Sequence, residues 1–192
     1  MAPEVARLGH VSLETPNLED SLSFFHDAVG LEIVERIDET VFLRAVDERD
    51  HHSLSLTAGD TARIDHIGWQ TAEPEDVAAF AQRFEEQGMD ITWIDEETEP
   101  GQGEAIRFEI PNGHRFELYG TMEKPEPPAE RRSKLQKPGY HPSRKNPVAP
   151  PKSDHAQIWD PPARACPEGY PGALGSQGEE DYDEGAGSRG GT

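Results

Sequence analysis

The alternation of apolar and polar residues predicts a repeated order of strands and helices in the first 120 residues. Residues 7–15 alternate in the manner of a half-buried strand. Pro16 and Asn17 then end the strand and offer a helix N-cap, and apolar residues follow at helical spacing up to Gly30, the residue type that commonly closes a helix. Three strands are predicted next, at 31–37, 40–46 and 52–57.

The same order begins again at residue 63. A strand is predicted at 64–71, and a helix that ends at Gly88 follows, with Val77, Phe80, Ala81 and Phe84 on its apolar face. The last three predicted strands lie at 90–94, 104–110 and 115–119, with a hairpin turn at 111–113. Each unit is too small to bury its own sheet face, so we expect the two units to pair and enclose a shared cleft. The predicted fold class is α+β.

The amino-acid composition changes near residue 120. The first 120 residues hold 27 acids, 8 arginines and no lysine, a net charge of −19, whereas the other 72 hold 11 acids and 10 bases. In those 72 residues 12 prolines and 9 glycines make up about 29%, a range in which packed cores are rare. We therefore expect a folded domain at 1–122 with modules at about 5–60 and 62–122. A basic, proline-rich linker at 123–153 and a mostly disordered tail at 154–192 complete the prediction.

The acidity of the chain argues against several classes of partner. With a formal charge of −20 it repels nucleic-acid backbones and anionic lipids, so we expect a small molecule or a metal ion as partner, but neither nucleic acid nor a membrane. The single cysteine, Cys166, excludes an internal disulfide, and no segment approaches the ~20 apolar residues of a membrane span. We expect a cytoplasmic protein. Acids without lysine over a whole domain resemble halophilic surfaces, with an ordinary acidic domain as the alternative.

Two histidines and one glutamate stand at positions that the repeat relates. His10 lies in the opening strand of the first module, His66 occupies the matching place in the second, and Glu117 lies on the final strand. Two imidazoles and one carboxylate on strands around a common cleft can hold one face of an octahedral metal and leave the other positions open. The alternative is structural: half-buried strand histidines and a solvent-facing carboxylate.

Three segments around these residues resemble the metal-binding strands of the vicinal oxygen chelate superfamily: LGHVSL at 8–13, IDHIG at 64–68 and PNGHRFELY at 111–119. VFLR at 41–44 followed by HHSLSL at 51–56 is similar to the extradiol ring-cleavage dioxygenases of the catechol 2,3-dioxygenase type. The resemblance covers about residues 5–122. It implies paired βαβββ modules, a catechol-type aromatic diol and O2 as substrates, and Fe(II), or alternatively Mn(II), held by His10, His66 and Glu117.

The resemblance also implies a catalytic role for His51. It lies 15 residues before His66, where the family carries a histidine that acts as acid and base beside the metal. The neighbouring His52 leaves this assignment ambiguous by one residue, and on a strand that shift turns the side chain to the opposite face. A histidine exposed in the acidic loop at 47–50 is the alternative.

Two features depart from the family pattern. Arg107 stands ten residues before Glu117, where catalytic domains of the family carry a tyrosine, and the segment 95–99 lacks the family's second active-site histidine. In the tail, residues 154–161 and 172–175 track residues 9–16 and 27–30 without a gap. This suggests a shortened relative of a two-domain dioxygenase that ends where the second domain begins, with chance similarity in a proline-rich tail as the alternative.

Two other functions on the same fold stay open. A glyoxalase-like isomerase or lyase needs no oxygen and usually has four protein ligands, for which Ser53, Ser55 and Thr57 are poor candidates. A non-catalytic lead domain would serve packing or assembly. Exposed sheet edges make a homo-oligomer a further expectation.

Overall fold

The computed structural model describes residues 2–126, 150, 152–153 and 155–156. The predictions for the linker and for the tail therefore fall almost entirely outside the described residues. None of the helices in the described part of the chain has the length and apolar character needed to span a bilayer.

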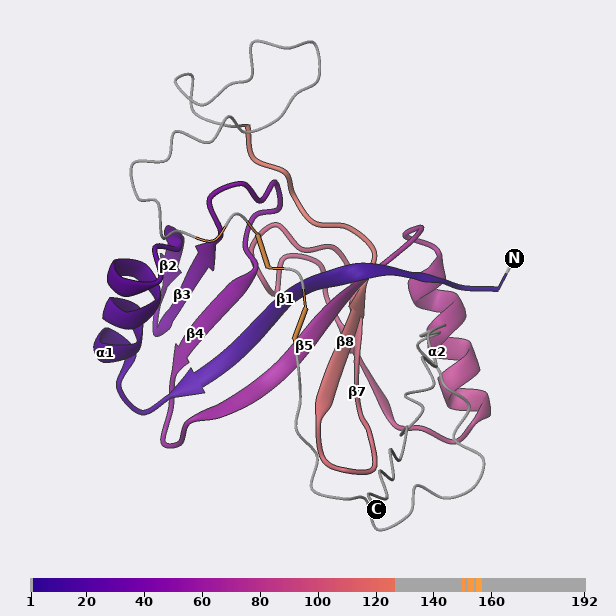
Figure 1. Cartoon of the computed structure of the whole chain (residues 1–192). Helices are drawn as coiled ribbons and strands as arrows, with labels where there is room; N and C mark the ends of the chain where they lie inside the picture. The colour runs from indigo at the N-terminus through magenta and orange to yellow at the C-terminus, as the bar shows by residue number, and fades with distance from the viewer. Residues whose placement is uncertain (1, 127–149, 151, 154, 157–192) are drawn as a thin grey trace, which may run out of the picture.

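Eight strands form one continuous sheet in the order β2-β3-β4-β1-β5-β8-β7-β6 (Figure 1). Their bounds are β1 (Val5–Thr15), β2 (Glu32–Ile37), β3 (Thr40–Arg44), β4 (Leu54–Ala58), β5 (Arg63–Thr71), β6 (Ile91–Ile94), β7 (Ala105–Glu109) and β8 (Arg115–Tyr119). The opening strands of the two predicted modules, β1 and β5, run antiparallel side by side at the centre. The α+β class is confirmed, and the two expected sheets are joined edge to edge into one.

The two halves of the sheet repeat the same pairing. β1 runs parallel to β4 in the first half, and β5 runs parallel to β8 in the second. Across the central pair His10 lies opposite Gly68, and Ser12 lies opposite His66. Because residues 10 and 66, like 12 and 68, are related by the same offset along the chain, the register describes an approximate twofold axis between β1 and β5.

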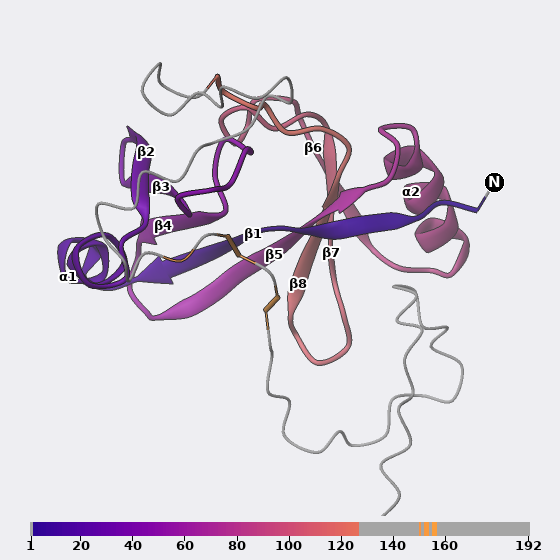
Figure 2. The same cartoon turned by 45° about the horizontal axis from the view of Figure 1, so that its top comes forward.

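Each half carries its helix at the predicted place (Figures 1 and 2). α1 (Leu18–Leu22) begins at Asn17, whose side chain accepts a hydrogen bond from the backbone N of Asp20 at 3.2 Å. It continues as a wider π-helical segment, η1 (Ser23–Ala28), and Gly30 closes it in the left-handed region at φ 89°. α2 (Asp76–Glu86) precedes Gly88, which is also left-handed at φ 76°.

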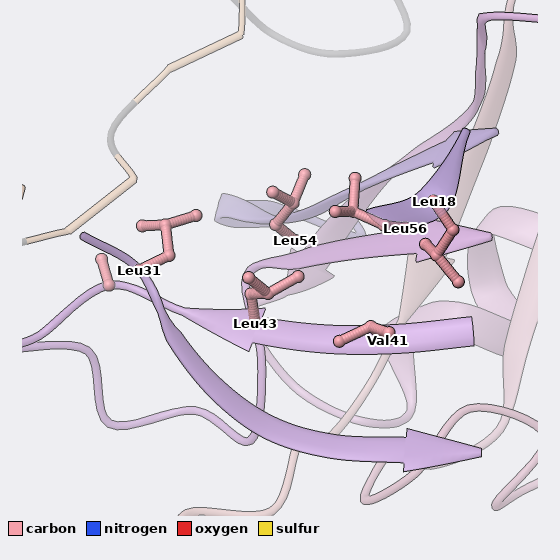
Figure 3. Close-up of a cluster of buried hydrophobic side chains, with 7 residues drawn as sticks. Leu18, Leu31, Val41, Leu43, Leu54 and Leu56 are labelled. Atoms are coloured by element: carbon pink, nitrogen blue, oxygen red, sulfur yellow. The ribbon is translucent and has the colours of Figure 1, made fainter. Parts of the chain in front are cut away.

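Each helix packs against its own half of the sheet. The core of the first half consists of Leu18, Leu31, Val41, Leu43, Ala45, Leu54 and Leu56 (Figure 3). The core of the second half consists of Val77, Phe80, Ala81, Phe84, Ile106, Phe108 and Leu118. Since side chains alternate along a strand, the neighbours of these residues face the other side of the sheet, and His10, His66 and Glu117 lie there.

We expect Phe84→Ala to lower the free energy of unfolding by about 3–5 kcal/mol, since it leaves a cavity in the second core. Phe84 is fully buried, and its ring centroid lies 4.8 Å from that of Phe108. Urea denaturation measures the loss. Phe24→Ala is the control, because Phe24 is 58% exposed and its replacement should cost less than about 1 kcal/mol. Equal losses in the two variants would contradict this packing.

Candidate metal centre

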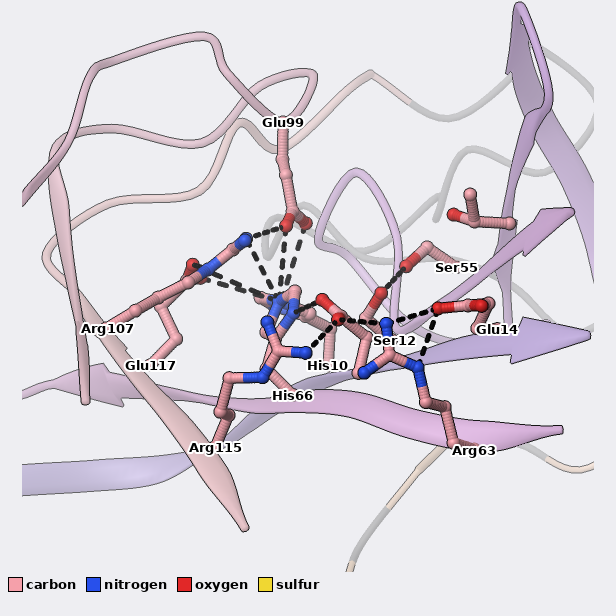
Figure 4. Close-up of polar contacts among 12 residues, drawn as sticks. His10, Ser12, Glu14, Ser55, Arg63, His66, Glu99, Arg107, Arg115 and Glu117 are labelled. Carbon is pink, nitrogen blue, oxygen red and sulfur yellow. Dashed lines mark hydrogen bonds and ion pairs between the residues drawn. The ribbon is translucent and has the colours of Figure 1, made fainter. Parts of the chain in front are cut away.

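Four side chains converge on one buried point on the sheet face opposite the helices (Figure 4). His10 comes from β1, His66 from β5 and Glu117 from β8, and Glu99 reaches in from the β6–β7 connection at 95–104. Each offers one ligand atom, and these atoms all lie within 4.8 Å of one another. The structure thus brings together the three residues predicted as ligands and adds a carboxylate that the sequence did not indicate.

Cross-strand register explains why these residues meet. His10, Gly68, Glu117 and Arg107 are successive partners across β1, β5, β8 and β7, so they form one row across the sheet. The imidazole of His10 lies over Gly68, where a Cβ atom would collide with the ring. Glycine at this position therefore leaves the space that the His10 imidazole fills.

The related row in the first half carries no carboxylate. His66, Ser12, Ser55 and Phe42 are the successive partners across β5, β1, β4 and β3. Ser55 therefore occupies the place that Glu117 has in the second half, and its hydroxyl bonds to that of Ser12 at 2.9 Å. The site takes one imidazole from each half, but both of its carboxylates from the second half.

The spans between donor atoms fit a single divalent ion. Nε2 of His10 lies 3.0 Å from Nε2 of His66 and 3.6 Å from Oε1 of Glu117. Oε2 of Glu99 lies 3.5 Å from Nε2 of His10, and Oε1 of Glu99 lies 3.2 Å from Nε2 of His66. Two ligands on one ion, each with a bond of about 2.1 Å, stand roughly 3–4 Å apart. Imidazole and carboxylate together are a donor set typical of Mn(II), Fe(II) and Zn(II).

Asp65 orients the His66 ring. Its Oδ2 lies 2.9 Å from Nδ1 of His66, and its Oδ1 lies 3.1 Å from Nη2 of Arg115. This carboxylate directs Nε2 of His66 towards the cluster, as a carboxylate behind a ligand histidine does in metal proteins. Burial lowers the pKa of His66, but hydrogen bonds to Asp65 and Glu99 and the charge of Glu117 outweigh it and raise that pKa to about 9.

The other charged groups of the cluster are perturbed in different directions. Burial holds the pKa of His10 well below its usual value, and burial also raises the pKa of Glu117. For Glu99, burial is outweighed by the imidazoles of His52 and His66, which lower its pKa. The site therefore favours a neutral imidazole at His10 and an ionised carboxylate at Glu99.

The structure places His52, not His51, against the cluster. His52 is fully buried, with its Nε2 3.4 Å from Oε2 of Glu99 and its ring centroid 5.2 Å from that of His10. His51 points elsewhere, with its Nε2 3.5 Å from Oε2 of Glu35. The catalytic role expected of one of these two histidines stays a prediction, and His52 is the one that faces the cluster. His51 is also buried, so the exposed-loop alternative does not describe it.

The sequence did not indicate Glu99 as a site residue, because Glu99 stands in an acidic run that is typical of a solvated loop. A length difference between the modules could have indicated it: the β6–β7 connection has ten residues, 95–104, while the related β2–β3 turn has two, 38–39. Gln102 in the same connection donates from its Nε2 to Oε1 of Glu117 at 2.8 Å.

The segment that follows β8 holds two loops of the site together. The backbone N of Glu123 donates to the carbonyl of Gly101 in the β6–β7 connection. The carbonyl of Glu123 accepts from the backbone N of His51 at 2.8 Å. A further backbone bond joins Gly103 N to the carbonyl of Thr121 at 3.0 Å. This exit segment therefore fixes the connection that carries Glu99 beside the segment that carries His52.

Comparisons with known proteins agree with this architecture. Residues 64–123 match the family model described as the catechol 2,3-dioxygenase-like N-terminal domain. A manganese-dependent 2,3-dihydroxybiphenyl 1,2-dioxygenase from Geobacillus genomosp. 3 is 48% identical over 159 residues, 83% of this chain and 50% of that protein. The chain belongs to the vicinal oxygen chelate superfamily.

Several further proteins that resemble this chain are also extradiol dioxygenases. A metapyrocatechase from Geobacillus stearothermophilus is 33% identical over 156 residues, 81% of this chain and 46% of that protein. The solved structure of an extradiol ring-cleaving dioxygenase from B. fuscum aligns with a TM-score of 0.62 at 28% identity, covering 65% of this chain and 35% of that one. The chain spans about half the length of the curated relatives it matches.

The raised pKa of His66 predicts a pH dependence of stability when a chelator removes metal ions. The folded state binds this proton more tightly than the unfolded state, so its stabilisation is complete below about pH 6.5 and is lost as the pH rises through about 9. Urea denaturation in EDTA should show the free energy of unfolding falling by about 1 kcal/mol or more across that range.

Asp65→Asn should reduce this fall, because it removes the carboxylate that helps to raise the pKa of His66. Asp60→Asn is the control, since Asp60 is an exposed carboxylate in the loop before β5. Identical pH profiles for wild type and Asp65→Asn would contradict the assignment.

Proposed function

We propose that the domain at 1–122 is a metal-dependent extradiol dioxygenase domain that opens a catechol-type aromatic diol with O2. His10, His66 and Glu117 are its proposed ligands. The observation that carries the proposal is the convergence of their buried donor atoms on one point across three strands. The similarity of the chain to several extradiol dioxygenases supports the chemistry.

Fe(II) and Mn(II) are the two proposed ions. Imidazole and carboxylate donors suit both, and the manganese dependence of the relative from Geobacillus genomosp. 3 supports Mn(II) beside the Fe(II) expected from the sequence. When bound, such an ion supplies Lewis acidity that favours the ionised diol and brings the diol and O2 into one coordination sphere.

The side chains around the ligands have roles of their own. Asp65 keeps Nε2 of His66 directed at the cluster. We assign to His52 the acid and base role first expected of His51, because His52 is the imidazole that faces the cluster. An imidazole there can accept a proton from a diol hydroxyl and return it to the product. The burial of the ligands shields the site from bulk water.

Glu99 favours a second candidate, a glyoxalase-like isomerase or lyase. Extradiol cleavage needs three coordination positions, two for the diol and one for O2, and three protein ligands on a six-coordinate ion leave three free. If Glu99 also binds the ion, two positions remain, which is enough for the two oxygens of an enediolate but leaves none for O2. The proposed dioxygenase therefore requires Glu99 to stay off the ion, and oxygen uptake separates the two reactions.

A third candidate, a non-catalytic lead domain, is supported by the match to an N-terminal domain model. Arg107 supports the same candidate, because it stands where catalytic domains of the family carry a tyrosine. This candidate predicts that wild type and His66→Ala have the same metal content.

We expect the wild-type chain, purified anaerobically and loaded with Mn(II) or Fe(II), to retain about one equivalent of metal and to consume O2 with 2,3-dihydroxybiphenyl or catechol. His66→Ala should lose both the metal and the oxygen uptake, because it removes a central ligand. His114→Ala, in the turn between β7 and β8, is the matched histidine control and should behave as wild type.

Metal analysis and an oxygen electrode give the two measurements. Bound metal without oxygen uptake would favour the four-ligand isomerase, and metal retained by His66→Ala would refute the ligand assignment.

A further inference from the structure

Arg107 contacts three of the four residues of the cluster (Figure 4). Its Nε donates to Oε2 of Glu117 at 2.5 Å, and its Nη2 donates to Oε1 of Glu99. The same Nη2 lies 3.3 Å from Nε2 of His66. A guanidinium thus stands against donor atoms that a metal ion would use.

The two carboxylates need a counter-cation in any state of the site. Glu117 is fully buried and Glu99 nearly so, and two ionised carboxylates at such burial are costly without a positive charge beside them. Arg107 supplies that charge through one hydrogen bond to each. The remaining oxygen of Glu117 is used as well, because Gln102 donates to it.

The related row of the sheet shows that this cation is specific to the second half. Arg107 pairs with Glu117 as Phe42 pairs with Ser55 in the first half. The row of the first half has neither a carboxylate nor a guanidinium, so the carboxylate of Glu117 and the guanidinium of Arg107 in the second half belong together. A divalent ion at the same carboxylates would stand within a few ångströms of the guanidinium and be repelled by it.

We propose that Arg107 is a built-in cation that competes with the divalent metal for Glu117, so that metal binding requires the guanidinium to withdraw from that carboxylate. The inference rests on the proposed function in taking this cluster as the metal site. The side chain of Arg107 is 22% exposed, which leaves it a route towards solvent. Arg107 thereby determines which ions enter, since only an ion that binds carboxylates strongly displaces it.

The test is Mn(II) affinity of the full chain, measured by electron paramagnetic resonance titration of metal-depleted protein. Arg107→Met keeps a long side chain but removes the charge, so it should bind Mn(II) about tenfold more tightly than wild type or better. Arg107→Lys keeps the charge and should stay close to wild type. Arg36→Met is the matched control, because Arg36 pairs with Glu19 at 2.8 Å on an exposed surface of β2.

The outcomes separate this inference from the proposed function. If folded Arg107→Met binds Mn(II) no more tightly than wild type, Arg107 is only a structural ion-pair partner, the inference is overturned and the metal site stands. If none of the four proteins binds Mn(II), or Fe(II) under anaerobic conditions, the proposed function fails and the inference fails with it.

A second measurement covers the case in which circular dichroism shows that Arg107→Met does not fold. Wild-type crystals soaked in Mn(II) should show the guanidinium moved away from Glu117. An ion bound at the cluster with Arg107 still paired to Glu117 would overturn the proposal.

Discussion

The antiparallel pairing of β1 with β5 is the constraint on which the rest of the site depends. It sets His10 opposite Gly68 and His66 opposite Ser12, and the parallel partner strand β8 then brings Glu117 beside them. A slip of one residue between the two strands would place His10 and His66 on opposite faces of the sheet and turn the apolar residues of the slipped strand out of their core. The burial of those cores is therefore what holds the register, and the register assembles the polar cluster.

Much of this arrangement could be predicted, because periodicity fixes which face a strand residue takes. The eight strands, both helices and the meeting of His10, His66 and Glu117 follow from alternation and from the internal repeat, although their role as ligands stays a prediction. His52 could not be distinguished from His51, since residues 51–53 precede β4 and strand alternation does not orient them. Glu99 was missed because an acidic run in a loop carries no information about a distant contact. Arg107 was noted only as a departure, since its bonds depend on how β7 pairs with β8.

The two halves of the sheet share the same strand pairing but carry different side chains at related places. The first half presents Ser12, Ser55 and Phe42 to the shared face, and the second presents Glu117 and Arg107 at the related places. The two carboxylates of the cluster, the guanidinium of Arg107 and the long β6–β7 connection all belong to the second half. The chemistry of the site is therefore asymmetric even though the histidines are related by the twofold register.

The backbone hydrogen bonds of Glu123 link two segments of the site at the end of the folded domain. This one residue bonds to the loop of Glu99 through its backbone N and to the segment of His51 and His52 through its carbonyl. A displacement of the backbone at Glu123 would therefore move the loop that carries Glu99 and the segment that carries His52 together. Glu99 and His52 therefore depend on one shared backbone contact for their positions relative to each other.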